Sequence, residues 1–401
     1  MSVTAAQGFV AAGVAAGIKA SGRPDLSLVA TADRRPVTAA GAFTTNLVAA
    51  APVQLSRRHL AGDPRAVAVV LNSGNANAAT GEPGLLVAEG SAALVSEALG
   101  CSRSDVLVCS TGLIGIPMPI DPFTTGVPAA AAALAATPEA GRAAAEAIMT
   151  TDTVPKEAVA TFEAGGATVT VGGMAKGAAM LSPAMATMLA VITTDAAVEA
   201  RTLQLALTTA VDASFNLMTT DGSRSTNDTV LVLAGGAAGN PPITAGTADA
   251  HALAGALTAV CASLSDQMAQ DAEGATKFVR LTVKGARSNA EALRAARAVA
   301  QSQLVKCSLF GGDPYWGRIL SELGASGAFL DPAGVDIAYN GFTVCVGGVA
   351  APGGFDAEAL AKSMQQKEIE VTADLRLGNG EATVTTVDLT PGYIDENMRT
   401  S

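Results

Sequence analysis

Short apolar runs rich in β-branched residues alternate with long Ala- and Leu-rich stretches along most of this 401-residue chain. The runs suited to strands are Ala66–Leu71, Val106–Cys109, Thr168–Val171, Met188–Thr193, Val230–Ala234 and Val279–Val283. The longer stretches repeat apolar residues at helical spacing and predict helices at roughly 84–99, 138–149, 197–215, 248–271 and 288–303. Strands that alternate with helices of this length predict a mixed α/β fold.

The pattern changes from about residue 286. Val335–Val346 alternates on both sides of Asn340-Gly341, a strong signal for a β-hairpin with a type I′ turn. A second hairpin is predicted over Ile369–Leu389, and a helix at about 356–366 separates the two. The chain is too long for one ordinary core. We therefore expect a smaller C-terminal α+β domain after a larger N-terminal domain.

The composition and charge of the chain indicate which partners and which cellular compartment to expect. The net charge is −11, from 36 acidic and 25 basic residues, and the longest basic run is the pair Arg57–Arg58. Nucleic acid is therefore not an expected partner. No stretch reaches the ~18–20 apolar residues of a membrane span. Phe9–Ile18 lacks a preceding basic segment, which favours a buried strand and turn over a signal peptide. Five scattered cysteines without CxxC indicate a reduced, cytoplasmic setting.

The residues available for catalysis are few. His59 and His251 are the only histidines, both in polar, helical surroundings, so a histidine-rich zinc site is not expected. The chain carries neither GxxxxGK[ST] nor GxGxxG after a strand, the common phosphate-binding patterns. An enzymatic nucleophile would have to be activated without histidine. A Thr or Ser whose own α-amino group is the base satisfies this condition.

One segment offers such a residue. Ala186 and Thr187 directly precede the apolar run Met188–Ile192, as at an internal cleavage site. Attack of the Thr187 hydroxyl on the preceding carbonyl, an N-to-O acyl shift and hydrolysis would leave Thr187 as a new N-terminus. Its α-amino group, with an ordinary pKa of roughly 7.7–8, would be a base near neutrality. A threonine at a strand start is more often structural, and this segment alone leaves both interpretations open.

Seven blocks of sequence resemble the ornithine acetyltransferase family, also called glutamate N-acetyltransferases, of arginine biosynthesis. They are GGMAKGAAMLSPAMATML (172–189), CSTGLIG (109–115), AIMTTDTVPKEA (147–158), NSGNANAATG (72–81), DGSRSTNDTV (221–230), QDAEGATK (270–277) and DPYWGR (313–318). The blocks keep the family's order, and the resemblance covers essentially the whole chain. The string KGxxMxxPxMATML is the most specific of them.

The resemblance implies a four-layer αββα sandwich, like the N-terminal-nucleophile hydrolases but with different connectivity, plus the smaller C-terminal α+β domain. It implies self-cleavage between Ala186 and Thr187 into an α chain, 1–186, and a β chain, 187–401. Residues of about 187–285 would complete the catalytic domain, and about 286–401 would form the C-terminal one. The chains would assemble as an α2β2 heterotetramer. The expected reaction is ping-pong acetyl transfer from N2-acetyl-L-ornithine to L-glutamate through acetyl-Thr187.

The resemblance also implies roles for single residues. Thr111 and Gly112 would form the oxyanion hole. The substrate-binding positions would be Thr150, Lys176, Thr187, Glu273 and Asn397, followed by a C-terminal hydroxyl from Thr400 or Ser401. Lys176 suits the α-carboxylate of an amino acid, and Glu273 suits an ammonium group. Without the resemblance, each would be interpreted as an ordinary surface ion.

Three departures from the family pattern leave the substrate range open. Tyr315 replaces Asn in DPNWGR, Ala79 replaces Cys in NANACTG, and the C-terminus lacks the family's Tyr. Alternatives are a paralogue of secondary metabolism with another acyl acceptor, an N-terminal-threonine amidase or aminopeptidase, and a non-catalytic metabolite-binding protein. No metal or organic cofactor is implied. Whether acetyl-CoA is a second acetyl donor stays open.

Overall fold

The computed structural model describes residues 2–180 and 188–398, which divide into two units. The first unit contains the described residues up to Asn216 together with Ser223–Met268. The second contains Leu217–Gly222 and the described residues from Ala269 onward. Among the described residues, no helix is both long and apolar enough to cross a membrane.

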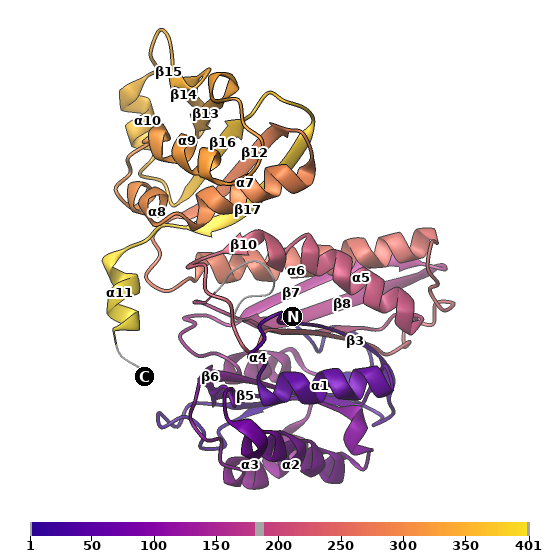
Figure 1. Ribbon diagram of the computed structural model, residues 1–401. Helices are drawn as coiled ribbons and strands as arrows, with labels where there is room; N and C mark the ends of the chain where they lie inside the picture. Colours follow the sequence, from indigo (N-terminus) through magenta and orange to yellow (C-terminus); the bar gives the residue numbers. More distant parts are fainter. Residues whose placement is uncertain (1, 181–187, 399–401) are drawn as a thin grey trace. The chain divides into compact units, whose positions relative to one another are not determined.

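Two sheets form the centre of the first unit (Figure 1). A six-stranded sheet has the order β4-β3-β11-β9-β8-β7, and a four-stranded sheet has the order β1-β2-β5-β6. The strands of the first sheet are β3 (Val37–Phe43), β4 (Arg65–Ala66), β7 (Lys156–Ala164), β8 (Ala167–Lys176), β9 (Leu189–Thr194) and β11 (Thr229–Ala234). Those of the second are β1 (Phe9–Val14), β2 (Leu26–Thr31), β5 (Ala68–Asn75) and β6 (Val106–Leu113).

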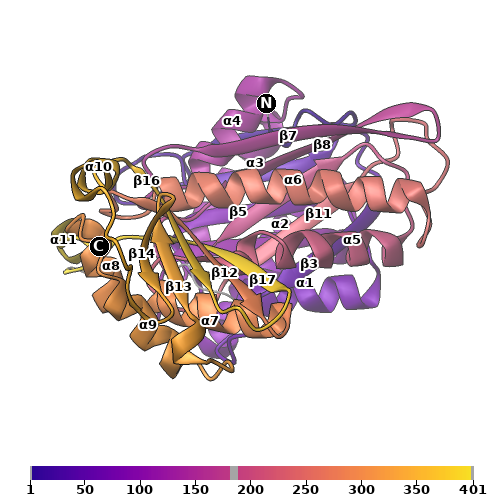
Figure 2. The same ribbon diagram turned by 90° about the horizontal axis from the view of Figure 1, so that it is seen from above.

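Helices cover the outer faces of both sheets. Figures 1 and 2 show α5 and α6 over the six-stranded sheet, whereas α2 and α3 lie on the far side of the four-stranded sheet. α1 lies along the edge strand β6, where the Ser56 hydroxyl bonds the backbone of Val108. A further helix, α4, packs against β1. The bounds are α1 (Ala51–Gly62), α2 (Gly81–Leu99), α3 (Asp121–Ala133), α4 (Pro138–Ala147), α5 (Ala200–Asp212) and α6 (Ala248–Gln270).

The core of the first unit explains this layering. Buried side chains of β2, β5 and β6 meet those of β8, β9 and β11 between the sheets, including Val29, Leu71, Leu107, Val191 and Leu231. These strands are apolar on both faces, because each sheet also packs against helices. The αββα sandwich predicted for the larger domain is therefore confirmed.

The second unit has a seven-stranded sheet, in the order β10-β17-β12-β16-β13-β14-β15, with α7 packed on β12 and β17. The strands are β10 (Met218–Thr219), β12 (Phe278–Ala286), β13 (Asp336–Tyr339), β14 (Phe342–Val346), β15 (Val349–Ala350), β16 (Glu368–Asp374) and β17 (Gly380–Val387). The helices are α7 (Asn289–Gln301), α8 (Gln303–Phe310), α9 (Trp316–Ala325), α10 (Ala357–Ser363) and α11 (Pro391–Asn397).

Of the two predicted hairpins, one is confirmed and one is wrong. β13 and β14 pair antiparallel around Asn340 and Gly341, which have φ angles of +48° and +83°, as a type I′ turn requires. β16 and β17 do not pair with each other, because β12 lies between them, parallel to β16 and antiparallel to β17. The boundary expected near residue 286 falls at the end of β12, within this second unit.

Candidate active site

Thr111 and Gly112 lie at the carboxyl end of β6, beside the end of the parallel strand β5. Gly112 has a φ of +134° and pairs with Gly74, which has a φ of +102°. A Cβ on Gly112 would lie 2.3 Å from the carbonyl carbon of Gly74 and 2.5 Å from the backbone nitrogen of Asn75. Only glycine permits this approach of the two strand ends. The result is an irregular strand end at which backbone groups leave the regular ladder.

A buried network of amides holds this strand end. The Ser110 hydroxyl donates to Asn72 Oδ1 at 2.6 Å, and Asn72 Nδ2 donates to the carbonyl of Asn75 at 2.9 Å. Asn227 Nδ2 donates to the carbonyls of Ala76 and Ser110, at 2.6 and 2.8 Å. Because these polar groups are buried and paired, the loops after β5 and β6 have fixed positions relative to each other.

Lys176, the last residue of β8, meets the same strand end. Its ammonium Nζ lies 3.3 Å from Thr111 Oγ1, and both side chains are buried. The same Nζ lies 4.0 Å from Asp152 Oδ2, which also accepts the backbone N–H of Thr150 at 3.0 Å. The structure thus brings together four of the predicted site residues, Thr111, Gly112, Thr150 and Lys176, in the first unit.

Asp152 is the centre of the charges at this site. Its Oδ1 accepts from Lys156 Nζ at 2.5 Å and from the backbone N–H of Gly177 at 2.8 Å. Burial alone would raise the pKa of the Asp152 carboxyl, but the charges of Lys176 and Lys156 outweigh it and lower this pKa to about 2. Asp152 is therefore ionised between two buried ammonium groups.

A second buried carboxyl, Asp228, lies where β9 begins. Its Oδ1 accepts the backbone N–H of Met188 at 3.0 Å. Burial raises the pKa of Asp228 well above its ordinary value. Ala186 and Thr187 lie outside the described residues, but Thr187 is bonded directly to the nitrogen of Met188. Asp228 therefore anchors the first described residue after the predicted cleavage position.

Asp152 and Asp228 were not singled out in the sequence. Both stand in blocks of the family resemblance, TTDTVPK and STNDTV, and this was the only available signal. An aspartate in a polar loop is exposed in most proteins. Their burial arises from the packing of segments far apart in the chain, which the local pattern does not reveal.

Glu273 and Asn397 lie in the second unit and contact each other. Asn397 Nδ2 donates to Glu273 Oε2 at 2.7 Å and to the carbonyl of Tyr393 at 2.9 Å. The Tyr393 hydroxyl donates to Asp221 Oδ2 at 3.3 Å. Burial, followed by the charges of Asp221 and Glu273, raises the pKa of Tyr393 to about 12. Thr400 and Ser401 lie outside the described residues.

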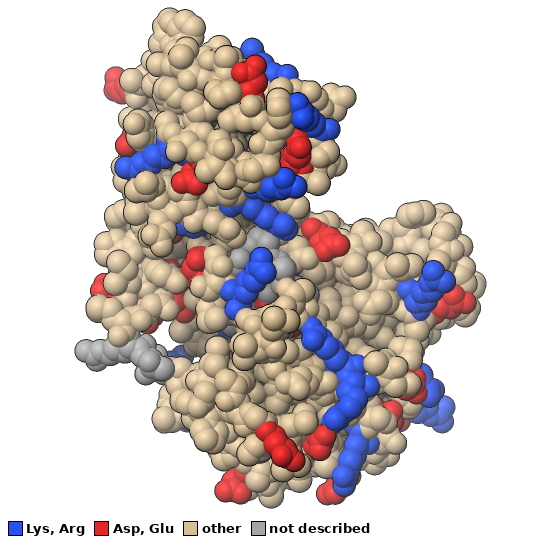
Figure 3. Space-filling model, in the orientation of Figure 1, with Lys and Arg blue, Asp and Glu red and all other residues tan. Residues whose placement is uncertain are grey.

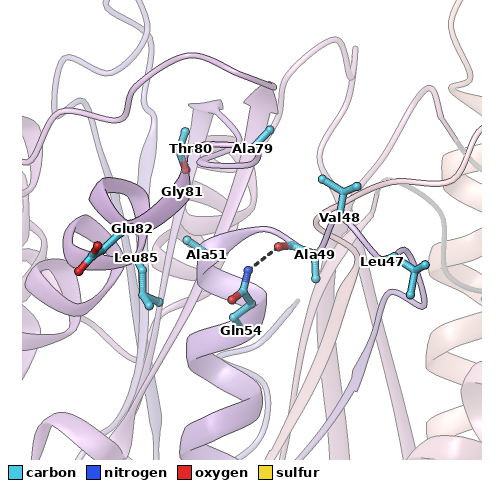
Figure 4. A pocket seen from close by; sticks show the side chains of 10 residues that line it. All are labelled: Leu47, Val48, Ala49, Ala51, Gln54, Ala79, Thr80, Gly81, Glu82 and Leu85. Carbon is cyan, nitrogen blue, oxygen red and sulfur yellow. Dashed lines mark hydrogen bonds between the residues drawn. The ribbon is translucent and has the colours of Figure 1, made fainter.

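A cavity of about 410 Å³ opens at the N-terminal ends of α1 and α2 (Figure 4). Its lining includes Leu47, Gln54 and Ala79, and none of the predicted site residues.

Two departures from the family pattern, Ala79 and Tyr315, lie within the described residues. Tyr315 is half exposed in the second unit, next to Arg318. His59 and His251 lie on α1 and α6, as expected of residues in helical surroundings. Basic and acidic side chains lie interspersed on the face shown in Figure 3.

Comparison with known proteins gives full-length matches. The model of the ArgJ family matches residues 10–400. The "Arginine biosynthesis bifunctional protein ArgJ" of Symbiobacterium thermophilum is 52% identical over 396 residues, which cover 98% of this chain and 97% of that protein. The protein of the same name from Geobacter sulfurreducens is 47% identical over 393 residues, with 98% of each chain covered.

Two solved structures carry related names. The crystal structure of an arginine biosynthesis bifunctional protein argJ from Bacillus halodurans is 34% identical, covers 51% of this chain and 96% of its own, and has a TM-score of 0.49. The ornithine acetyltransferase of Mycobacterium tuberculosis complexed with ornithine is 44% identical, covers 45% of this chain and 94% of its own, and has a TM-score of 0.41.

Proposed function

The chain belongs to the ArgJ family of arginine-biosynthesis acyltransferases, and from this premise we propose that it transfers an acetyl group from N2-acetyl-L-ornithine to L-glutamate. The transfer is ping-pong, with an acetyl-Thr187 intermediate. It follows autoproteolysis between Ala186 and Thr187, and the two resulting chains assemble as an α2β2 heterotetramer in the cytoplasm.

The first half-reaction releases ornithine. The Thr187 hydroxyl oxygen attacks the acetyl carbonyl, and its proton passes to the α-amino group of the same residue. The oxyanion of the tetrahedral intermediate accepts hydrogen bonds from the Thr111 hydroxyl and the Gly112 backbone N–H. Collapse of the intermediate breaks the amide C–N bond, and the leaving amine takes the proton from the α-ammonium. Thr187 then carries the acetyl ester.

The second half-reaction runs in the opposite direction with another amine. The α-amine of glutamate attacks the ester carbonyl, the same oxyanion hole stabilises the intermediate, and Thr187 leaves as a hydroxyl. N-acetylglutamate is released and the enzyme returns to its starting state. Neither half-reaction requires a metal or an organic cofactor. Acetyl-CoA is to be tested as a second acetyl donor.

Charged residues of opposite sign are proposed to bind the amino-acid substrates. Lys176 presents a cation for the α-carboxylate, with Thr150 nearby on the same loop as Asp152. Glu273, paired with Asn397, presents an anion for an ammonium group of ornithine or glutamate. A hydroxyl of Thr400 or Ser401 adds a further contact.

The observation that carries this proposal is the contact of Lys176 Nζ with Thr111 Oγ1 at 3.3 Å, next to Gly112 with its φ of +134°. It provides a buried, positively charged position for an oxyanion, which an acyl transfer requires. The test is to incubate the purified protein with N-acetylornithine, with and without glutamate. Without glutamate, at most one equivalent of ornithine per active site is expected, and continued release should depend on glutamate, with equal formation of N-acetylglutamate. Continued release of ornithine over many turnovers without glutamate would assign an amidase or aminopeptidase instead.

The substrate range is tested in the same assay. A panel of N-acetyl amino acids as donors, and of amines and acetyl-CoA as alternative partners, measures kcat/KM for each. N-acetylornithine with glutamate should be the best pair. A clear preference for another amine would indicate a paralogue with an altered acceptor.

A further inference from the structure

Four buried side chains form a continuous row at the predicted oxyanion hole, in the order Lys156, Asp152, Lys176 and Thr111. The carboxylate oxygens of Asp152 face opposite neighbours, Oδ1 towards Lys156 and Oδ2 towards Lys176. The side chains of Asp152 and Lys156 are fully buried, and that of Lys176 is 4% exposed. Burying such a group of charges costs free energy of desolvation, which only close pairing and hydrogen bonding offset.

The contact between Lys176 and Thr111 determines where the hydroxyl hydrogen of Thr111 points. An ammonium group has only donors, so Thr111 Oγ1 must be the acceptor in its contact with Lys176. A hydroxyl has a single hydrogen, and this hydrogen must then point away from Lys176. An oxygen that accepts a charge-assisted hydrogen bond is also a stronger donor through its own O–H. The Thr111 hydroxyl is thereby set as a donor.

Asp152 supplies a buried carboxylate 4.0 Å from the Lys176 ammonium. Its two oxygens also accept the backbone N–H groups of Gly177 and Thr150, at 2.8 and 3.0 Å, so the carboxylate is held from four sides. Other charged groups that act on these residues are Lys19, whose Nζ donates to the carbonyl of Met149, and the buried Asp228. Without the carboxylate, two buried cations would remain without their anion, and Lys176 would lose its proton or its place.

We propose that Asp152 is a positioning residue of the acetyl transfer: it holds the Lys176 ammonium on Thr111, so that the Thr111 hydroxyl donates its proton to the oxyanion. Lys156 neutralises and orients the outer oxygen of Asp152. This inference rests on the proposed function, and it assigns to Lys176 a second task besides binding a carboxylate.

The test is a double-mutant cycle on the rate of acetyl transfer. Asp152→Asn and Thr111→Val are made singly and together, and kcat is measured at saturating N-acetylornithine. Loss of one oxyanion donor typically costs about 10²–10³-fold, which is the expected loss for Thr111→Val. Asp152→Asn should lower kcat by about 10–10²-fold. The double variant should have a kcat within about threefold of Thr111→Val, because the proposal has Asp152 raise kcat through that hydroxyl, whereas an effect on substrate binding through Lys176 or Thr150 would change KM.

Two further variants make the result decisive. Lys176→Met removes the ammonium but leaves Asp152 paired with Lys156, so it serves where Asp152→Asn does not fold. Its effect on kcat should also vanish in the Thr111→Val background, whereas the loss of the proposed carboxylate contact should raise KM in both backgrounds. Asp195→Asn is the matched control. Asp195 is equally buried and accepts the backbone N–H groups of Gln7 and Thr170, without a described contact to Lys176. Asp195→Asn should leave kcat within about twofold of the wild type.

The outcomes separate the inference from the function on which it rests. Losses that multiply in the double variant, or full activity of Asp152→Asn, would overturn the positioning role. If the cleaved wild-type protein transfers no acetyl group, the proposed function itself fails, whatever the variants show. Intact mass and thermal unfolding of each variant verify that only cleaved, folded protein enters the comparison.

Discussion

Replacing Gly112 by alanine perturbs the predicted oxyanion hole at its tightest point. The new Cβ would lie 2.3 Å from the carbonyl carbon of Gly74, 2.5 Å from the nitrogen of Asn75 and 2.7 Å from the oxygen of Gly74. All three are backbone atoms, which cannot move away by a side-chain rotation. Real Cβ contacts are essentially never below 3.0 Å, so the strand ends must separate by at least 0.7 Å, the difference between 3.0 and 2.3 Å.

This displacement sets the size of the expected effect. A shift of about 1 Å in a catalytic group costs about 10²-fold in rate, and the φ of +134° adds about 1–3 kcal/mol of backbone strain for a residue with a Cβ. We therefore expect Gly112→Ala to lower the kcat of acetyl transfer by about 10²-fold or more and to lower the unfolding temperature by several degrees.

The matched control is Gly115→Ala, in the segment that follows β6. Gly115 also has a positive φ, +81°, but a Cβ there meets no atom within 4 Å. Its replacement carries only the backbone cost of about 1–2 kcal/mol. Steady-state kinetics should find Gly115→Ala within about threefold of the wild type. Equal activities of the two variants would refute the assignment of Gly112 to the site.

Three further predictions concern charge. The pKa of Asp152 is lowered from 3.8 to about 2, so its ionised form contributes about 2 kcal/mol to the free energy of unfolding above pH 4. This contribution is lost as the pH falls to about 2. Urea unfolding at several pH values should show the loss in the wild type and not in Asp152→Asn. The pKa of Asp228 is raised, so the folded state loses stability as the pH rises above the ordinary value of 3.8. Asp228→Asn keeps an acceptor for the Met188 N–H and should unfold at the same or a higher temperature at neutral pH; a lower one would contradict the burial argument. Glu273→Gln should raise KM for N-acetylornithine by about tenfold with a smaller change in kcat, because it removes one charge-assisted contact; an unchanged KM would exclude Glu273 from substrate binding.

Much of the architecture is readable from periodicity. β5, β6, β8, β9, β11 and β12 lie at the predicted strand positions, and the six predicted helices correspond to α2, α4, α5, α6, α7 and α10. The predicted hairpin of β16 and β17 was wrong, because each strand pairs with β12 instead. A strand that alternates apolar and polar residues has the same pattern whether its neighbour is the next strand in the chain or a third strand such as β12.

The candidate site was predicted by resemblance and not by pattern. Thr111, Gly112 and Lys176 are ordinary residues in their local sequence, and only the family blocks singled them out. Neither the local sequence pattern nor the family resemblance revealed the contacts of Asp152. Its role depends on two lysines, one of them at the end of β8, which tertiary packing brings to its carboxylate.

The central claim is that the polypeptide severs itself before Thr187 and that the threonine so exposed is the nucleophile. Intact-mass spectrometry of the purified, active protein tests it most directly, with Thr187→Ala beside it. We expect two chains, one ending at Ala186 and one beginning at Thr187, and a gain of one acetyl group on the second chain after a brief exposure to N-acetylornithine. Thr187→Ala should give a single inactive chain. An unbroken wild-type chain with full acetyl-transfer activity would contradict it.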